Sequence, residues 1–394
     1  MVGMVIESTN TLVRKPVSAL ERLAVQLRIQ ARAFRLGLEA SGSLRKALAA
    51  TFRLWREHTR ASGWGIPANL CRVDGRYFLN LNTPGFPSIA FDRVLRQRVA
   101  EVLGLSSASG LFMGFVAMTR KCGLDCEHCF EWEALNQAES LGDEDLFFII
   151  QRVIDLGAGQ IVLTGGEPLN RFPTLIRILD LFRDSGVDFW INTSGVGLSE
   201  ERAIELKRHG LTGVVVSLDH HVESEHDRFR GRRGCYRAAV FAAGLAHEQG
   251  LVTALSLCPT NDFISTENLD AYMDLARDLK VSFVRVVEPK AVGRYAQSEV
   301  ALTGGNQRLL ELLSERFDGN RRELRSFPII NYPDYSKRRE GCVGGKRYLY
   351  VDMEGNVSPC PFCKATSVRI DQLDRTNLSG RLTCPAERLQ GAIG

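Results

Sequence analysis

The sequence has no run approaching the roughly 20 consecutive apolar residues that a membrane-spanning helix needs. Its first residues, from Met1 to Glu7, lack the charged stretch followed by an apolar stretch that marks an export signal. Ten cysteines in 394 residues are far too sparse for a small secreted scaffold held by disulfides. Repeats and low-complexity tracts are also missing. These absences exclude an integral membrane protein, and we expect a cytoplasmic chain with reduced thiols.

The overall composition is that of a globular protein, with 44% apolar and 24% charged residues. At roughly 100–200 residues per domain, the length allows two or three domains. The net charge of +4 is unevenly distributed. Between Arg14 and Arg60, eleven Lys or Arg residues accompany only three Glu residues, so this segment alone carries a charge of +8. The rest of the chain is therefore slightly acidic.

Apolar residues in this basic segment recur at steps of three and four, which predicts amphipathic helices. They are Leu20, Leu23, Ala24, Leu27, Ala31, Phe34 and Leu38, followed by Leu44, Leu48, Phe52 and Trp55. We expect a helical pair that packs its apolar stripe on the main domain and leaves its arginines in solvent. The alternative is a surface for anionic lipid headgroups or an acidic peptide, with nucleic acid a less favoured partner.

Residues 61–110 change character and complete an N-terminal extension of residues 1–110. Two apolar segments flank Asp74-Gly75, which predicts a β-hairpin, and a helix is expected from Ile89 to Val102. A Ser- and Gly-rich link at residues 106–110 suggests a domain boundary.

Short apolar segments alternate with amphipathic helical stretches between residues 111 and 300. The expected strands are Phe112–Met118, Gln160–Leu163, Phe189–Ile191, Gly213–Ser217, Leu251–Leu257 and Ser282–Val287. Helices are expected near 142–157, 173–185, 199–209, 235–249 and 267–279. Six such units predict an α/β fold with parallel strands, either a partial barrel or an open doubly wound sheet. Functional residues should then lie at the carboxyl ends of the strands.

Three cysteines follow the first of these strands, as Cys122-x3-Cys126-x2-Cys129. Thiolates favour zinc, copper(I) or iron–sulfur clusters. A four-iron cluster held by only three cysteines leaves one iron open to another ligand. The alternative is a zinc knuckle completed by His128 or a more distant residue, although we interpret His128 as a loop residue.

The end of the next strand carries Gly165-Gly166-Glu167-Pro168. Two glycines allow a close backbone approach to a ligand, and a carboxylate such as Glu167 can accept hydrogen bonds from an ammonium group. Together with the three-cysteine loop and the aromatic Phe130 after it, this motif resembles the radical S-adenosylmethionine (SAM) superfamily. The resemblance covers residues 111–300.

The resemblance implies a partial (β/α)6 TIM-like barrel and a [4Fe–4S] cluster on Cys122, Cys126 and Cys129. SAM would bind the open iron, with Gly165, Gly166 and Glu167 recognising its amino group. Reductive cleavage of SAM would yield a 5′-deoxyadenosyl radical that removes a hydrogen atom from the substrate.

Three further residues are carried over from the same resemblance. Asn192 follows the third strand and Ser217 ends the fourth, and both are expected near the SAM ribose or carboxylate. Arg230 lies in a stretch similar to the family's loop after strand four. Cys235 and Cys258 have no close cysteine partner, and we interpret them as packed core thiols.

A second cysteine set, in a small C-terminal domain of residues 301–394, comprises Cys342, Cys360, Cys363 and Cys384. A predicted hairpin over residues 348–357 folds Cys342 back toward Cys360, which leaves a zinc ribbon or an iron–sulfur site open. The Cys342-x12-Gly355-x4-Cys360 spacing resembles the SPASM and twitch extensions of radical SAM enzymes. Because no dense cysteine run follows Cys363, the resemblance implies one auxiliary [4Fe–4S] cluster, with Cys384 as its least certain ligand.

The sequence thus predicts a radical SAM oxidoreductase with a helical N-terminal extension that caps the mouth of the barrel. An auxiliary cluster suits oxidative modification of a peptide, or of an anionic lipid or other small molecule, with a flavodoxin or ferredoxin as reductant. The cytoplasmic enzyme would then also be a candidate for peripheral association with a membrane surface. The competing hypothesis is a non-catalytic zinc protein that binds RNA or another anion through its basic helices.

Overall fold

A computed structural model describes residues 17–61, 70–105, 110–318, 324, 326–364 and 366–382. Cys384, a predicted ligand of the auxiliary cluster, lies outside these residues. None of the helices in these ranges is long and apolar enough to cross a membrane.

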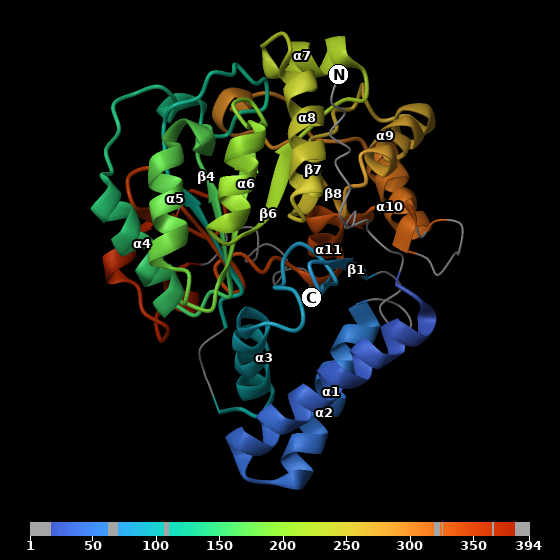
Figure 1. Cartoon of the computed structure of the whole chain (residues 1–394), viewed down its shortest axis with the longest axis vertical. Helices are drawn as coiled ribbons and strands as arrows, with labels where there is room; N and C mark the ends of the chain where they lie inside the picture. Colours follow the sequence, from blue (N-terminus) through green and yellow to red (C-terminus); the bar gives the residue numbers. More distant parts are fainter. Residues whose placement is uncertain are drawn as a thin grey trace, which may run out of the picture.

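A single ten-stranded sheet organises the molecule, in the order β12-β11-β10-β3-β4-β5-β6-β7-β8-β9 (Figure 1). Its first six strands along the chain are β3 (Met113–Ala117), β4 (Gln160–Thr164), β5 (Asp188–Thr193), β6 (Leu211–Ser217), β7 (Val252–Leu257) and β8 (Phe283–Val286). The remaining strands are β9 (Ile329–Asn331), β10 (Tyr348–Val351), β11 (Asn356–Ser358) and β12 (Val368–Arg369). All pairs from β10 through β3 to β9 are parallel, whereas β11 and β12 are antiparallel. The predicted α/β class with parallel strands is confirmed, as a sheet whose two edges remain unpaired within the described residues.

Helices connect the parallel strands and cover the outer face of the sheet (Figure 1). They are α4 (Asp143–Asp155), α5 (Phe172–Leu181), α6 (Glu200–Arg208), α7 (Glu223–Arg230), α8 (Cys235–Glu248), α9 (Thr266–Asp278) and α10 (Gly304–Asp318), followed by α11 (Pro333–Glu340) and α12 (Leu378–Arg381). Short 3-10 turns lie at η1 (Trp132–Ala134), η2 (Pro168–Arg171), η3 (Gly293–Tyr295) and η5 (Ile370–Gln372). The six predicted strands and the helices between them are confirmed, but α7 was missed because it is mostly polar and has no apolar periodicity.

Side chains alternate along each strand between two separate cores. One core joins the outer face of the sheet to the helices and includes Val216, Leu255 and Val284. The other lies on the inner face of the curved sheet and includes Trp190, Val215 and Phe283. The strands therefore enclose a partial barrel whose interior is packed at one level by large apolar side chains.

The segment after residue 300 adds strands on both sides of the six strands β3 to β8. Strand β9 pairs with β8, and β10 pairs with β3. The predicted hairpin is confirmed as β10–β11, with Tyr350 opposite Ser358. The cysteine-rich tail is thereby built onto the barrel, and the boundaries at residues 110 and 300 remain a proposal.

The predicted N-terminal hairpin is also confirmed, as β1 (Cys71–Val73) and β2 (Arg76–Phe78) around a turn in which Asp74 and Gly75 both have positive φ angles. Its position differs from the prediction. Arg76 pairs with Asp188 at the start of β5 at 2.8 Å, and Gln160 at the start of β4 donates to the carbonyl of Leu81 at 2.9 Å. The hairpin closes the amino end of the barrel, so the expectation that it caps the catalytic mouth was wrong.

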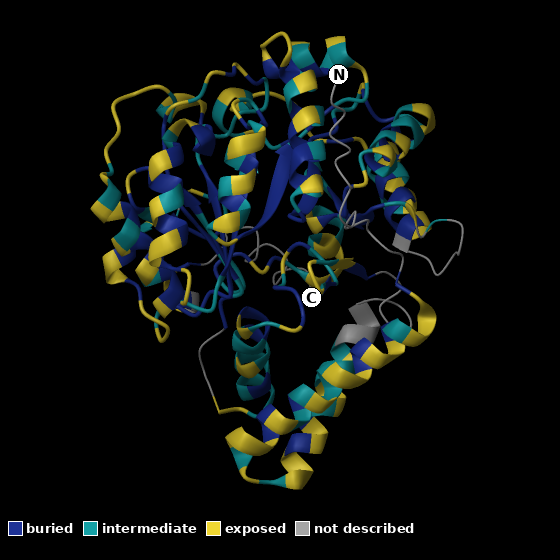
Figure 2. Ribbon diagram, in the orientation of Figure 1, coloured by how far each residue is buried: buried dark blue, intermediate teal, exposed yellow. Residues whose placement is uncertain are grey.

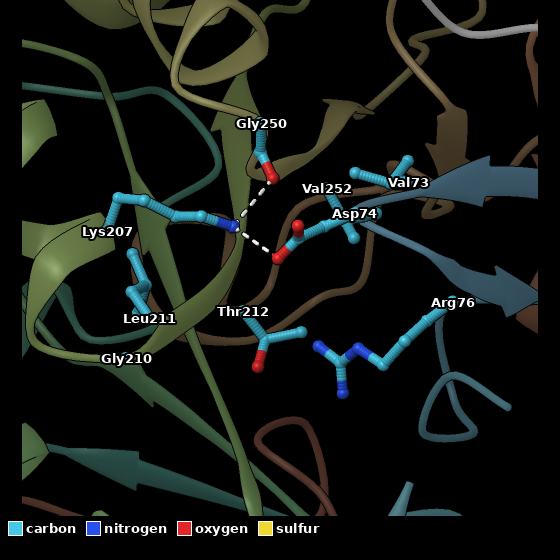
Figure 3. Close-up of a pocket in the computed structure, with 9 residues that line it drawn as sticks. All are labelled: Val73, Asp74, Arg76, Lys207, Gly210, Leu211, Thr212, Gly250 and Val252. Carbon is cyan, nitrogen blue, oxygen red and sulfur yellow. Dashed lines mark hydrogen bonds and ion pairs between the residues drawn. The ribbon is translucent and has the colours of Figure 1, made fainter. Parts of the chain in front are cut away.

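Packing explains why the hairpin goes to this end. Phe78 is completely buried in the inner core and meets Trp190 edge to face, with ring centroids 6.3 Å apart. A cavity of about 160 Å³ remains beside the hairpin, where the Lys207 ammonium contacts the Asp74 carboxylate at 2.8 Å and the Gly250 carbonyl at 3.0 Å (Figure 3). The cavity belongs to the closed amino end of the barrel, opposite the predicted cysteine site.

Helices α1 (Ala19–Ser41) and α2 (Leu44–Ala61) pack against each other and against α3 (Ile89–Val102), beyond the closed end of the barrel (Figure 1). Arg32 contacts Asp92 of α3 at 2.6 Å. The buried side of α1 consists of Arg22, Val25, Gln26, Ala33, Leu36 and Gly37.

The two predicted apolar stripes lie largely in solvent (Figure 2). Leu20 is 81% exposed, and Phe52 is 59% exposed. The expectation that the stripe packs on the main domain was wrong, because small side chains such as Ala33, Gly37 and Ala47 allow the helices to pack closely on the opposite side.

We expect Phe78→Ala to lower the free energy of unfolding by about 3–5 kcal/mol, because it empties a completely buried site in the inner core. Phe148→Ala is the matched control, since Phe148 on α4 is 51% exposed, and its effect should be within about 0.5 kcal/mol. Denaturant unfolding followed by circular dichroism measures both values. Equal losses of unfolding free energy in the two variants would contradict the buried position of Phe78 at the closed end of the barrel.

Candidate functional site at the carboxyl ends of the strands

The three-cysteine loop follows β3 and is held by contacts from distant segments. The backbone N–H groups of Asp125 and Glu127 donate to the carbonyls of Arg230 and Phe229 at 3.1 and 3.0 Å. Asn136 holds Cys122 through two hydrogen bonds, at 3.0 and 3.1 Å. The loop is therefore fixed between the end of α7 and the segment after η1.

Cys122, Cys126 and Cys129 share one small apolar cluster with Leu124, Val196 and Cys235. Burial raises the pKa of Cys122 to about 11 and that of Cys129 to about 12, so binding a metal centre would release protons from these thiols. Among the described residues, no three His, Cys, Asp or Glu side chains converge on a point suited to a single metal ion. A four-iron cluster bonds each cysteine to a different iron, and this donor set fits such a cluster better than zinc.

The predicted glycine pair lies directly beside the start of the cysteine loop. Gly165 has φ +117°, and a Cβ there would lie 2.7 Å from the carbonyl oxygen of Thr119. The N–H groups of Gly166 and Glu167 donate to the carbonyls of Thr119 and Lys121 at 2.7 and 2.8 Å. The close backbone approach that the sequence predicted toward a ligand is made here to the protein's own chain.

Glu167 is buried and connects the ends of β4 and β5. Its Oε1 accepts from the Thr193 hydroxyl at 2.6 Å and from the Leu169 N–H at 3.2 Å. Its Oε2 accepts from the N–H and hydroxyl of Ser194 at 2.8 and 2.5 Å. Burial raises the pKa of Glu167 even though these four hydrogen bonds favour the charged form.

Ser217 and Asn192 both lie on the inner face of the barrel. Ser217 is level with Ser256 of the neighbouring strand β7. Asn192 is level with Val215, an inner-core residue, and its side-chain oxygen is buried without a described partner. Both side chains are thus available at the inner face where the sequence expected them to meet SAM.

Arg230 reaches the cysteine loop from the end of α7. Its guanidinium contacts the Asp219 carboxylate at 2.6 Å and donates from Nη1 to the Cys126 sulfur at 3.6 Å. Burial alone would lower the pKa of Arg230, but the Asp219 carboxylate raises it, so the guanidinium stays charged. Asp219 in turn accepts from the Cys258 N–H at 2.9 Å. A positive charge is therefore fixed beside Cys126.

The remaining candidates near this loop are packed side chains. His128 stacks on Phe229 with ring centroids 4.7 Å apart, and burial lowers its pKa to about 4. Cys235 donates from its sulfur to Asp227 at 3.2 Å, and Cys258 is buried. These environments fit the interpretation of all three as residues that bind no metal.

The second cysteine set gathers around Tyr348. Burial and the neighbouring thiols of Cys342 and Cys360 raise the pKa of Tyr348. Cys360 and Cys363 are paired across a tight turn, in which the Cys363 N–H donates to the Cys360 carbonyl at 3.1 Å. Three predicted auxiliary ligands thus come from one small region beside β10.

The two cysteine loops contact each other, which the sequence did not reveal. Phe130, next to Cys129, meets Phe362 of the Cys360–Cys363 turn with ring centroids 5.6 Å apart. Glu131 accepts from the Tyr350 hydroxyl at 2.6 Å and contacts the Lys364 ammonium at 2.9 Å. One carboxylate therefore joins the end of the first loop to β10 and to the residue after Cys363.

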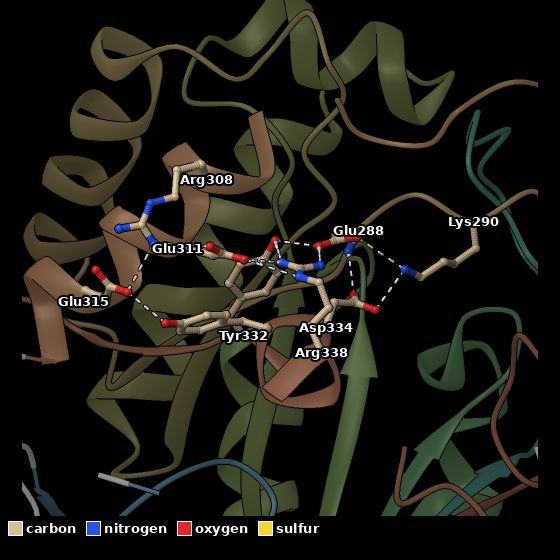
Figure 4. Close-up of polar contacts among 9 residues, drawn as sticks. Glu288, Lys290, Arg308, Glu311, Glu315, Tyr332, Asp334 and Arg338 are labelled. Atoms are coloured by element: carbon tan, nitrogen blue, oxygen red, sulfur yellow. Dashed lines mark hydrogen bonds and ion pairs between the residues drawn. The ribbon is translucent and has the colours of Figure 1, made fainter. Parts of the chain in front are cut away.

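A dense polar network lies at the carboxyl end of β8 (Figure 4). Glu288 accepts from the Tyr332 hydroxyl at 2.5 Å and from the Arg338 guanidinium at 2.6 Å. Burial alone would raise the pKa of Glu288, but these hydrogen bonds hold it below its ordinary value. Both hydrogen bonds end on Oε1 of Glu288, and Lys290 lies 3.5 Å from Oε2, so the carboxylate fixes Arg338 of α11 to the end of β8.

Sequence reasoning missed several residues that build this site. Thr193 and Ser194 hold Glu167, Asn136 holds Cys122, and Glu131 joins the two loops. Only Asn136 carries a local signal, a positive φ angle of 59°. The other contacts join segments that are distant in the sequence, so no spacing pattern could have identified them.

Fold and site define the class of protein. The family model described as the radical SAM superfamily matches residues 116–279, which contain the cysteine loop, the glycine pair, Asn192, Ser217 and Arg230. Residues 116–279 of the chain therefore match the radical SAM superfamily, whose members use a [4Fe–4S] cluster and SAM.

Two proteins of known activity are similar to this chain in sequence. The chain is 28% identical over 250 residues to PqqA peptide cyclase from Rhizobium meliloti, a match that covers 62% of this chain and 65% of that protein. It is 26% identical over 269 residues to AdoMet-dependent heme synthase from Methanosarcina barkeri, covering 62% of this chain and 75% of that protein. The chain thus covers slightly less than two thirds of the length of the first of these relatives.

Solved structures share the fold at low sequence identity. Streptococcus suis SuiB bound to its precursor peptide SuiA matches with a TM-score of 0.58 and 18% identity, over 92% of this chain and 83% of SuiB. The enzyme anSMEcpe with bound AdoMet matches with a TM-score of 0.50 and 17% identity, over 68% of this chain and 80% of that one.

We expect Gly166→Ala to displace the cysteine loop, because the added Cβ would collide with the carbonyl oxygen of Lys121, next to Cys122. The variant should lose about 1–3 kcal/mol of stability and retain less iron after anaerobic reconstitution. Gly304→Ala is the control, since a Cβ at Gly304 meets nothing within 4 Å. Iron analysis and thermal unfolding test this, and wild-type values for Gly166→Ala would refute it.

Proposed function

We propose that this protein is a radical SAM enzyme that oxidatively modifies a peptide by activating a C–H bond. The observation that carries the proposal is the contact between the two cysteine loops at the carboxyl ends of the strands, through Phe130 and Phe362. A substrate radical formed next to the first cluster would thus lie close to a second centre able to accept an electron. The competing zinc hypothesis is not favoured, because the family match points to iron–sulfur chemistry.

Residues of the site fit the cofactors of the family. Cys122, Cys126 and Cys129 would hold the [4Fe–4S] cluster, and Arg230 places a cation beside Cys126. Gly165, Gly166, Glu167, Asn192 and Ser217 are the proposed contacts of SAM. When bound, this cofactor pair supplies one-electron cleavage of SAM and removal of a hydrogen atom from the substrate.

Glu167 has a double role in this proposal. Its carboxylate already orders the end of β5 through Thr193 and Ser194, and the same buried negative charge would attract the SAM ammonium group. The hydroxyl and backbone donors of Thr193 and Ser194 favour the charged form of Glu167 and fix the orientation of its carboxylate.

Cys342, Cys360, Cys363 and Cys384 are the proposed ligands of one auxiliary [4Fe–4S] cluster. A fourth ligand would close the cluster and suit it to carrying electrons away from the substrate. Electrons for the first cluster are proposed to come from a flavodoxin or ferredoxin.

A peptide is the preferred substrate because of the names of two similar proteins, PqqA peptide cyclase and SuiB with its bound precursor peptide. A small molecule is the second candidate substrate, because the chain is also similar to AdoMet-dependent heme synthase. Both would have to reach the cysteine loop at the carboxyl ends of the strands, because the β1–β2 hairpin closes the other end of the barrel.

We expect anaerobically reconstituted wild-type protein to contain about seven or eight irons per chain and to cleave SAM when reduced. Cys126→Ala should abolish SAM cleavage and leave about four irons, whereas Cys360→Ala should still cleave SAM. Cys71→Ala is the control, because Cys71 is buried at the opposite end of the barrel. Zinc with little iron, or full SAM cleavage by Cys126→Ala, would end the proposal.

The peptide assignment has its own experiment. Short peptides encoded beside this gene are incubated with enzyme, SAM and dithionite under anaerobic conditions, and mass spectrometry follows the peptide. Oxidative modification should remove the mass of two hydrogen atoms in wild type but not in Cys126→Ala. If SAM is cleaved but no such peptide changes while a small-molecule substrate does, the class is correct and the substrate assignment is wrong.

A second proposal concerns the exposed stripes of α1 and α2, defined as Leu20, Leu23, Leu27 and Leu38 with Leu44, Leu48 and Phe52. We propose that they dock peripherally on an anionic membrane surface. The acidic residues of these helices face the rest of the protein, since Glu21, Glu39 and Glu57 contact Tyr77, Arg96 and Arg98.

Several basic residues of α1 and α2, unlike the acidic ones, point away from the rest of the protein. Arg35, Arg45 and Lys46 are exposed and make no ion pair with described residues. Exposed leucines beside such cations are typical of helices that lie in the interface of anionic bilayers.

We expect the protein to co-sediment with vesicles of phosphatidylcholine and phosphatidylglycerol, but weakly with phosphatidylcholine alone. Leu48→Glu combined with Phe52→Glu should reduce the bound fraction about tenfold, since charges would enter the apolar part of the interface. Phe241→Glu is the matched control, because Phe241 on α8 is 57% exposed on another part of the surface. Equal binding by both variants, or binding to RNA or an acidic peptide in place of vesicles, would contradict the membrane proposal.

A further inference from the structure

A row of polar residues crosses four neighbouring strands of the barrel. Ser217 of β6 is level with Ser256 of β7, Ser256 with Arg285 of β8, and Arg285 with Asn331 of β9. Parallel strands point paired residues to the same face of the sheet. The four side chains therefore lie next to one another.

The row faces the inside of the barrel. The residues two positions earlier on these strands are Val215, Ala254, Phe283 and Ile329, and all four belong to the inner core. Because side chains two apart on a strand point the same way, the polar row lies one level above this apolar floor, toward the carboxyl ends. Its first member, Ser217, is also a proposed SAM contact, so the row extends from the SAM site across the barrel.

Arg285 is the charged member of the row, and its charge has no counter-ion among the described residues. Its Nε and Nη2 both donate to the Ser256 hydroxyl at 3.2 Å, and it makes no described ion pair. Burial lowers the pKa of Arg285 to about 10, which still leaves the guanidinium charged at neutral pH.

Other buried arginines of the barrel are paired. Arg230 contacts Asp219 at 2.6 Å, and Arg120 contacts Glu354 at 3.1 Å. A buried guanidinium without a carboxylate costs stability, and a ligand that supplies the missing charge would recover it.

Asn331 adds a second unfilled group beside Arg285. Its side-chain oxygen is buried and has no hydrogen-bond partner among the described residues. The Arg285 guanidinium can donate to both oxygens of a carboxylate, and the amide nitrogen of Asn331 is a further donor on the neighbouring strand. The unpartnered amide oxygen of Asn331 would accept a hydrogen bond from an N–H or O–H group of the same ligand.

We propose that Arg285, with Asn331 beside it, binds a carboxylate group of the substrate inside the barrel. Resting on the proposed function, this assigns the modified peptide an acidic side chain or a terminal carboxylate next to the reacting position. A phosphate is disfavoured because its second negative charge would find no second cation in the row.

Acetate is the probe that tests this inference on cluster-loaded, SAM-saturated protein, with chloride at equal ionic strength as the reference. Acetate should raise the melting temperature of wild type with a saturable dependence. Arg285→Lys, which keeps the charge but loses the guanidinium geometry, should need about tenfold more acetate, and Arg285→Met should not respond.

The melting temperatures of Arg285→Met and Arg230→Met give a second test, which does not depend on the affinity of acetate. Without acetate, Arg285→Met should raise the melting temperature because it removes an unpaired charge. Arg230→Met should lower it, because that change leaves Asp219 buried without its partner. A lowered melting temperature in Arg285→Met together with no acetate response in wild type would overturn the inference.

Two outcomes distinguish binding of a substrate carboxylate by Arg285 from binding of SAM and from a failure of the proposed function. If Arg285→Met weakens SAM binding at least tenfold, measured by equilibrium dialysis, Arg285 holds SAM and the substrate assignment is wrong. If wild type cleaves SAM while acetate has no effect and Arg285→Met has a lowered melting temperature, this inference fails and the proposed function stands.

Discussion

The backbone contact between the end of β4 and the segment that leads into the cysteine loop determines how the functional site is arranged. Two N–H groups of the Gly166-Glu167 stretch bond the carbonyls of Thr119 and Lys121, at a separation that a side chain at Gly166 would prevent. The same stretch holds Glu167, which orders the end of β5. Strand ends, cysteine loop and the buried carboxylate are thus fixed by a few short hydrogen bonds.

Much of the barrel could be predicted from the sequence, because parallel strands buried on both faces are continuous apolar segments and the helices between them are amphipathic. The cysteine spacing and the glycine pair were likewise visible, since both are local patterns. What was missed depends on contacts between distant segments. Helix α7 has no apolar stripe, and the link from Glu131 to Lys364 joins residues more than two hundred positions apart.

The errors about the N-terminal extension have a common physical cause. An apolar stripe identifies a helix but does not say which side of it will be covered, and α1 packs through its smaller residues instead. Likewise, a hairpin motif carries no information about which end of a barrel it will meet. The hairpin binds the amino end of the barrel because Phe78 packs against Trp190 and Arg76 pairs with Asp188 there.

The β1–β2 hairpin closes one end of the barrel. Phe78 and Trp190 lie almost completely buried at this end, one level below Val215. A molecule that contacts the polar row of Ser217 and Arg285 must therefore arrive and leave on the side where the cysteine loop lies.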